Sequence, residues 1–222
     1  MIKAVIFDID GTLIDSVDLH AKAWFETFQH FGHDIPFDRV RQQIGKGGDQ
    51  LLPALLPEDA VEAHGKEIEK FRSELFRREY LSQVHPVPGV RDLFERIRSD
   101  GKKIVLASSA KGDELDAYKK IADIEGLCEA ETSSDDAEKS KPHPDIFEAA
   151  MATLPGVGPN EVIVIGDTPY DSEAASKAKL RTIGVLCGGF PEDQLRAAGC
   201  FAIFRDPAHL LSRYDESPIA LD

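Results

Sequence analysis

The sequence predicts an α/β fold in which a parallel β-sheet, covered by helices, carries an inserted α-helical cap subdomain. Short β-rich runs alternate with amphipathic segments along most of the 222 residues, a pattern typical of βαβ units. The run Val162-Ile163-Val164-Ile165 is apolar throughout, as expected for a strand that is buried on both faces of its sheet. One helical block of ~65 residues interrupts the alternation, and it is too long for an ordinary crossover between two strands.

The alternating part of the chain predicts the order of its elements. We expect five strands, at residues 3–9, 102–107, 161–166, 182–186 and 201–204, and residues 129–133 are a candidate for a sixth. Helical patterns fall between the strands, near residues 89–99, 112–120, 143–153, 170–179 and 206–213. Because helices connect successive strands, we expect the strands to lie parallel in one sheet.

The interrupting block shows only amphipathic helical stretches, near residues 19–31, 37–43, 50–55 and 57–82. We therefore expect a core domain of residues 1–15 and 85–222 and a helical cap subdomain of residues 16–84. The segment His85-Pro86-Val87-Pro88-Gly89 is the expected hinge.

Composition excludes several classes of partner. The formal net charge is −14 at pH 7, so a nucleic acid or an anionic membrane surface would be repelled, whereas a small anionic metabolite needs only a local positive pocket. Cys128, Cys187 and Cys200 have neither metal-site spacing nor the even number of a disulfide framework. No apolar run approaches the ~20 residues that span a bilayer and no secretion signal is visible, so we expect a soluble, cytoplasmic protein. A monomer is the default expectation.

Two aspartates follow the first apolar run. Because strand side chains alternate between faces, Asp8 and Asp10 would point the same way at the sheet edge, underneath the inserted helices. Two adjacent carboxylates repel each other unless a cation or a proton lies between them, so the pair indicates a metal site or an acid/base pair. For Asp8-Ile9-Asp10-Gly11 alone, a strand that ends in a polar turn explains the pattern about equally well.

Two later segments add groups suited to an anion. Ser108 and Ser109 follow the strand at residues 102–107, where a hydroxyl and the backbone N–H groups of a helix start suit phosphate oxygens, although an ordinary N-cap serine is the competing interpretation. Lys141 lies between Ser140 and Pro142 just ahead of a helix start, which favours an inward-facing ammonium over the usual solvated lysine.

A second acidic cluster follows the strand at residues 161–166. Asp167 lies at the end of that strand, and Pro169 suits a first helical turn, which leaves Asp171 near the helix N-terminus. Either aspartate alone would be an unremarkable helix cap. Together with the groups at the other strand ends, they predict a cation site and an anion site side by side.

In this order, the four segments resemble the four sequence motifs of the haloacid dehalogenase superfamily of phosphohydrolases. The matching stretches are Asp8-Ile9-Asp10-Gly11-Thr12-Leu13-Ile14-Asp15-Ser16, Ser108, Ser140-Lys141-Pro142-His143-Pro144-Asp145-Ile146-Phe147 and Gly166-Asp167-Thr168-Pro169-Tyr170-Asp171. The resemblance covers essentially the whole chain and implies a Rossmann-like core. The inserted helices are similar to the cap of the subgroup that contains phosphoglycolate phosphatases, β-phosphoglucomutases and 2-haloacid dehalogenases.

The resemblance implies a Mg²⁺-dependent phosphatase that acts on a small phosphorylated metabolite. Asp8 would be the nucleophile that forms an aspartyl-phosphate, and Asp10 the general acid and then the general base. The groups that would bind the phosphoryl oxygens are Ser108, Ser109 and Lys141. The metal would be held by Asp8, Asp10 through its backbone carbonyl, Asp167, and Asp171 directly or through water. Hard oxygen ligands without a His or Cys cluster favour Mg²⁺ over zinc.

Three other activities fit the motifs less well. A dehalogenase would lack Asp10, so the motifs argue against that activity. A β-phosphoglucomutase-like phosphomutase is a closer alternative, because the residues around His20 are similar to those of such mutases. These mutases carry a basic pair where this chain has glycine and aspartate, within residues 44–49. Lys46 is the one residue there that could replace the missing positive charge. A non-catalytic phospho-acceptor or regulatory module would have little use for Asp10.

The cap is expected to choose the substrate by closing over it. His20 and Lys46 are the candidates for cap contacts with the substrate, although a packed helix histidine explains His20 about equally well. The identity of the phosphoester is not encoded in any motif that we can read.

Overall fold

The computed structural model describes residues 1–110 and 112–221, with residue 113 described by its backbone alone. Six strands form one sheet in the order β5-β4-β1-β6-β7-β8, and every neighbouring pair is parallel. Their bounds are Ala4–Phe7 (β1), Lys103–Ala107 (β4), Ala130–Thr132 (β5), Val162–Gly166 (β6), Arg181–Val185 (β7) and Ala202–Phe204 (β8). The predicted α/β fold is confirmed, and the candidate strand at residues 129–133 is present.

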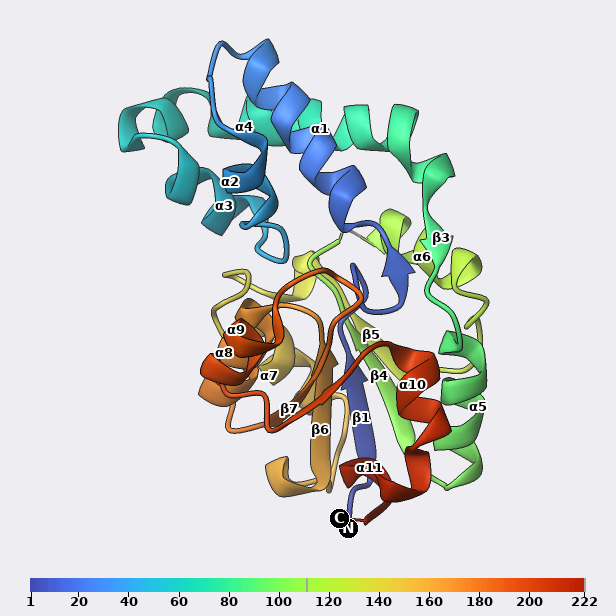
Figure 1. Ribbon diagram of the computed structural model, residues 1–222. Helices are drawn as coiled ribbons and strands as arrows, with labels where there is room; N and C mark the ends of the chain where they lie inside the picture. The colour runs from blue at the N-terminus through green and yellow to red at the C-terminus, as the bar shows by residue number, and fades with distance from the viewer. Residues whose placement is uncertain (111, 222) are drawn as a thin grey trace.

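Helices cover both faces of the sheet (Figure 1). Alternate strand residues enter two separate hydrophobic clusters, with Val5 and Phe7 on one face and Ala4 and Ile6 on the other. The first face is covered by α5 (Val90–Ser99), α6 (Gly112–Ile121), α10 (Pro207–Ser212) and α11 (Pro218–Leu221). The second face is covered by α7 (Asp145–Ala152) and α8 (Pro169–Lys177), and α9 (Glu192–Ala197) packs beside α8.

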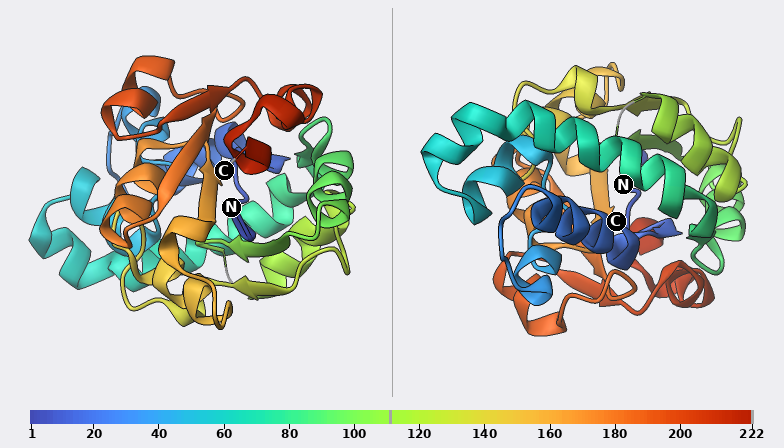
Figure 2. Two further views of the ribbon diagram at one scale, coloured as in Figure 1. Left: turned by 90° about the horizontal axis from the view of Figure 1, so that it is seen from below. Right: turned by 90° about the horizontal axis from the view of Figure 1, so that it is seen from above.

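Residues 16–84, which we call the helical insert, contain four α-helices and no strand of the main sheet. These helices are α1 (Val17–His30), α2 (Phe37–Arg41), α3 (Gly48–Leu55) and α4 (Glu58–Leu75), and a π-helical turn (Phe76–Tyr80) and a 3₁₀ turn (Leu81–Gln83) continue α4. Trp24, Phe28 and Ile68 belong to a hydrophobic cluster of the insert's own. Seen from above, α1 and α4 cross over the sheet (Figure 2). Among the described residues, no helix combines the length and hydrophobicity needed to cross a membrane.

The junction between the insert and the sheet is a small strand pair that the sequence did not predict. Ile14–Asp15 (β2) pairs antiparallel with His85–Pro86 (β3), where the chain leaves for the insert and returns from it. The backbone N–H of Val87 also donates to the carbonyl of Leu13 at 2.9 Å. This pair could not be predicted, because a two-residue strand is too short to show alternation of apolar and polar residues. In addition, a proline such as Pro86 normally argues against a strand.

Candidate active site

The carboxyl ends of β1, β4 and β6 lie side by side because Phe7 pairs with both Leu106 and Ile165. Asp8 directly follows Phe7, and its backbone N–H donates to the carbonyl of Ile165 at 2.9 Å. Ser108 is the first residue after β4, and Asp167 is the first after β6. The register of the sheet thus brings three of the predicted segments to one edge.

Lys141 joins this edge from the loop before α7. Its ammonium donates a hydrogen bond to Asp8 Oδ1 and lies 2.7 Å from Asp171 Oδ1. The Lys141 and Asp171 side chains are each 1% exposed. Burial acts to lower the pKa of Lys141, but the carboxylates of Asp171 and Asp8 outweigh it and raise that pKa, so the ammonium stays charged.

Asp167 is the third buried carboxylate of the cluster. Thr12 Oγ1 lies within hydrogen-bonding distance of both Asp167 Oδ1, at 3.1 Å, and Asp8 Oδ2, at 3.3 Å. Among the residues that the structure describes, none forms a hydrogen bond to the buried Asp167 Oδ2. Gly11 has φ of +78°, and a Cβ atom there would lie 2.8 Å from Asp167 Cγ, so only glycine allows the two strand ends to approach so closely.

Negative charge exceeds positive charge in this cluster. Burial raises the pKa of Asp8 to about 7, and Lys141 only partly offsets that effect. Burial, followed by repulsion from Asp8 and Asp171, raises the pKa of Asp167 well above its usual value. One oxygen from each of the three aspartates lies within 4.8 Å of the others. Buried carboxylate oxygens in this number, one of them unpaired, fit a hard divalent cation such as Mg²⁺.

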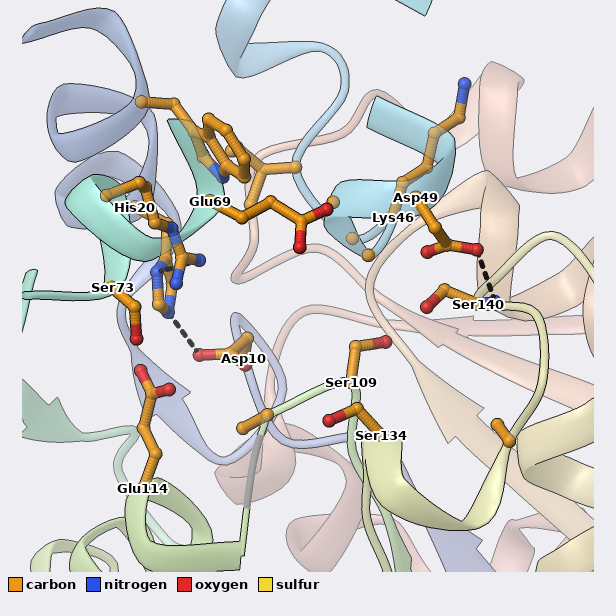
Figure 3. A pocket seen from close by; sticks show the side chains of 18 of the residues that line it. Asp10, His20, Lys46, Asp49, Glu69, Ser73, Ser109, Glu114, Ser134 and Ser140 are labelled. Carbon is orange, nitrogen blue, oxygen red and sulfur yellow. Dashed lines mark hydrogen bonds and ion pairs between the residues drawn. The ribbon is translucent and has the colours of Figure 1, made fainter. Parts of the chain in front are cut away.

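Asp10 has a different environment. Ser16 Oγ donates to Asp10 Oδ1 at 2.6 Å, and His20 Nε2 lies 2.9 Å from the same oxygen (Figure 3). Burial acts to raise the pKa of Asp10, but His20 and Ser16 outweigh it, and the pKa lies below its usual value. The pKa shifts of the two carboxyl groups therefore have opposite directions, upward for Asp8 and downward for Asp10. An ionised nucleophile and a protonated acid need the reverse, which a cation beside Asp8 and a phosphate beside Asp10 would supply.

The tautomer of His20 follows from its neighbours. Arg72 Nη2 lies 3.1 Å from His20 Nδ1, and because a guanidinium can only donate, Nδ1 accepts. The ring proton is then on Nε2, which donates to Asp10, with Tyr118 Oη 3.2 Å from the same nitrogen. The ring also stacks on Phe76 at a centroid distance of 3.9 Å.

A cavity of about 670 Å³ lies between the helical insert and the sheet edge, and Figure 3 shows several of the side chains that line it. Asp8 and Asp10 lie in its wall on the core side, together with Ser109. On the insert side, α4 and the π-helical turn after it contribute a charged lining of Lys66, Glu69, Lys70, Arg72, Glu74 and Arg77. The cavity therefore suits a small, polar ligand.

The remaining predicted residues differ in their placement. Ser109 and His20 line the cavity. Ser108 is fully buried and its Oγ accepts the N–H of Ala110 at 3.0 Å, which is the contact of a serine in a turn, because α6 begins only at Gly112. Lys46 also lines the cavity, but its ammonium donates to Gln43 Oε1 at 2.7 Å and lies 4.6 Å from the centre of the Tyr170 ring.

Three residues of the site were not predicted from the sequence. Thr12 lies inside the first motif, and its position two residues after Asp10 was the available signal. Arg72 and Tyr118 lie on helices with many charged or polar residues, and no spacing in the sequence distinguishes them from solvated side chains. Asp49 was noted in the sequence, but its contact with Ser140 was not predicted.

Known proteins of the same fold match this chain over most of its length. A family model described as haloacid dehalogenase-like hydrolase matches residues 5–185. A solved hydrolase from Pseudomonas syringae superimposes with a TM-score of 0.89 and 30% sequence identity, covering 96% of this chain and 98% of that one.

Characterised relatives are similar in sequence. A phosphoglycolate phosphatase from Aquifex aeolicus is 32% identical over 84% of this chain and 85% of its own length. A β-phosphoglucomutase from Bacillus subtilis is 31% identical, covering 82% of this chain and 83% of its own length. Protein SUPPRESSOR OF QUENCHING 1, chloroplastic, from Arabidopsis thaliana is 32% identical over 83% of this chain, which spans 18% of the plant protein. The chain belongs to the haloacid dehalogenase-like hydrolase family.

Proposed function

We propose that this protein is a Mg²⁺-dependent phosphatase that hydrolyses a small phosphorylated metabolite through an aspartyl-phosphate on Asp8. The observation that carries the proposal is the buried cluster in which Lys141 contacts Asp8 and Asp171 beside Asp167, next to a polar cavity. Such a cluster combines a nucleophilic carboxylate, a fixed positive charge and a set of hard oxygen ligands. Catalysis of phosphoryl transfer requires these features.

The first half-reaction transfers the phosphoryl group to the protein. A carboxylate oxygen of Asp8 attacks phosphorus, and the bond between phosphorus and the ester oxygen breaks. Asp10 gives its proton to the departing alkoxide. Its pKa is low in the ligand-free site, and the negative charge of a bound phosphoryl group raises it, which favours the protonated acid.

In the second half-reaction, Asp10 takes a proton from water, the water oxygen bonds to phosphorus, and the bond to Asp8 breaks. Inorganic phosphate leaves and Asp8 is regenerated. Throughout, Lys141, the Ser109 amide and the Ser108 segment would bind the phosphoryl oxygens. Bound Mg²⁺, held by Asp8, Asp167, Asp171 and the backbone carbonyl of Asp10, would supply positive charge that offsets the carboxylates and the phosphoryl group.

The helical insert is the proposed cap, with residues 16–84 as the cap subdomain and residues 1–15 and 85–222 as the core. Contacts from the insert to the core around the cavity support this division, among them the Tyr170 hydroxyl, which donates to the carbonyl of Gln42 at 2.6 Å. The cytoplasmic location and the monomeric state expected from the sequence stay predictions.

A phosphomutase is the second candidate, favoured by the relative from Bacillus subtilis. Such an enzyme must hold a second phosphate at the far end of its cavity. In this chain the first turn of α3 places Asp49 in the cavity wall, and Gly48 packs against the carboxylate of Glu69. Two carboxylates there would repel a second phosphate, so water is the better acceptor.

The test measures inorganic phosphate released from p-nitrophenyl phosphate and from a panel that includes phosphoglycolate and hexose phosphates, with Mg²⁺ present. We expect release from at least one compound, and loss of release in Asp8→Asn but not in Asp92→Asn, an exposed aspartate on α5. Interconversion of hexose phosphates without net release would favour the mutase. Phosphorylation of Asp8 without turnover would indicate a regulatory module.

A further inference from the structure

The core holds the backbone on both sides of Lys141. The carbonyl of Ser140 accepts the N–H of His143 at 3.0 Å. The carbonyl of Pro142 accepts from the ammonium of Lys177 at 2.6 Å. These contacts leave the backbone N–H of Ser140, which precedes Lys141, to be satisfied from elsewhere.

That N–H is bound by the helical insert. Asp49, in the first turn of α3, accepts the Ser140 N–H on Oδ2 at 3.0 Å (Figure 3). Gln50 Nε2 donates to the same oxygen at 2.9 Å and orients the carboxylate. The backbone of Gly47 touches the Ser140 side chain, because a Cβ atom at Gly47 would lie 2.5 Å from Ser140 Cβ. The insert thus docks on the residue next to Lys141.

We propose that Asp49 is a positioning residue that acts through Ser140 to set the place of the Lys141 ammonium. The proposal rests on the proposed function to the extent that Lys141 binds the phosphoryl group. When the insert docks, the hydrogen bond that the Ser140 N–H donates to Asp49 completes the set of contacts that fixes the Ser140–Lys141 backbone. A small rotation of this backbone would move the ammonium at the end of a long side chain away from Asp8.

The arrangement couples docking of the insert to the strength of phosphate binding. With the insert docked, Lys141 is held where it meets phosphoryl oxygens; with the insert undocked, the Ser140 amide loses its partner. Asp49 would act on phosphate without touching it, which distinguishes it from a residue that contacts the substrate.

The experiment compares Asp49→Ala and Asp49→Asn with the matched control Asp38→Ala, an exposed aspartate in the first turn of α2. Affinity for inorganic phosphate in the presence of Mg²⁺ is measured by calorimetry, and hydrogen exchange of the Ser140 amide by NMR. Loss of a hydrogen bond to a charged acceptor predicts about tenfold weaker phosphate binding in Asp49→Ala. Asp49→Asn keeps a side-chain oxygen acceptor and should recover most of the affinity.

The hydrogen-exchange rate of the Ser140 amide should rise in Asp49→Ala and stay near the wild-type rate in Asp38→Ala. Wild-type phosphate affinity in Asp49→Ala would overturn the proposal, as would an equal loss in Asp38→Ala. A changed KM for a larger substrate with unchanged phosphate affinity would also overturn it, because Asp49 would then contact the substrate directly. The phosphate and exchange measurements need no turnover, so they decide the role of Asp49 even if no phosphoester is hydrolysed.

Discussion

Lys141 Nζ lies 2.7 Å from Asp171 Oδ1, and both side chains are almost completely buried. The same ammonium donates to Asp8, which is 133 residues away in the sequence. A buried lysine is tolerated only when its charge is paired, and here two carboxylates pair it. Lys141 therefore neutralises buried negative charge in the core, in addition to its proposed role in binding the phosphoryl group.

Replacing Lys141 by methionine should lower stability as well as activity. The substitution keeps most of the side-chain volume but leaves Asp8, Asp167 and Asp171 without a counter-charge, which predicts a loss of about 3–5 kcal/mol in the free energy of unfolding. Urea unfolding in EDTA measures this loss. The exposed Lys139→Met is the control and should change stability little. An equally stable Lys141→Met variant would show that the three carboxylates are protonated in the folded protein.

Removal of divalent metal should abolish turnover and lower the thermal stability. A cation among three buried carboxylates relieves their mutual repulsion, and binding to the folded state alone raises stability by mass action. We expect EDTA to stop phosphate release, and added Mg²⁺ to restore it and to raise Tm. In Asp167→Asn the metal-free protein should be more stable than wild type at neutral pH, because a carboxyl whose pKa is raised by folding destabilises the folded state there, and Mg²⁺ should stabilise the variant less. Full activity after rigorous chelation would contradict the metal assignment.

The architecture could be predicted because its signals are local and strong. Apolar runs such as residues 162–165 are too hydrophobic for any place but a covered sheet, and a parallel sheet brings their carboxyl ends to one edge. The meeting of Asp8 and Asp167 followed from that one geometric rule, whereas Asp171 joins them from the first turn of α8 and Lys141 from the loop before α7. The π-helical turn after α4 and the β2–β3 pair had no comparable signal, because each spans only a few residues.

The partners of His20 could not be predicted for a different reason. Arg72 comes from α4 and Tyr118 from α6, and each contact depends on how the insert sits on the core. A sequence pattern reports which face of a helix is apolar, but the angle between two packed helices depends on all of their side chains. The role of Lys46 as a cap contact stays a prediction, since Lys46 lines the cavity while its ammonium donates to Gln43 beside the Tyr170 ring.

The stability of the metal-free protein should fall as pH rises through the weakly acidic range. The pKa of Asp8 is about 7 in the folded protein against 3.8 as its reference value, so the folded state binds more protons between these pH values. The free energy of unfolding therefore decreases from about pH 4 to about pH 7. Urea titrations in EDTA at several pH values should show a steeper decrease for wild type than for Asp8→Asn. Parallel curves for the two proteins would contradict the raised pKa.

Substituting His20 should move one limb of the pH profile. His20 contributes to the low pKa of Asp10, so His20→Ala should raise that pKa. In the first half-reaction Asp10 acts as an acid, and the alkaline limb of kcat reports the pKa at which its proton is lost in the substrate complex. That limb should shift to higher pH in His20→Ala, with a lower maximum because Asp10 is no longer oriented.

His64→Ala, at an exposed histidine on α4, is the control and should leave the pH profile in place. Arg72→Met should lower the maximum in the same way, since Arg72 fixes the His20 tautomer that donates to Asp10. A His20→Ala profile that keeps its wild-type limbs would show that His20 only packs against Phe76 and has no part in holding Asp10.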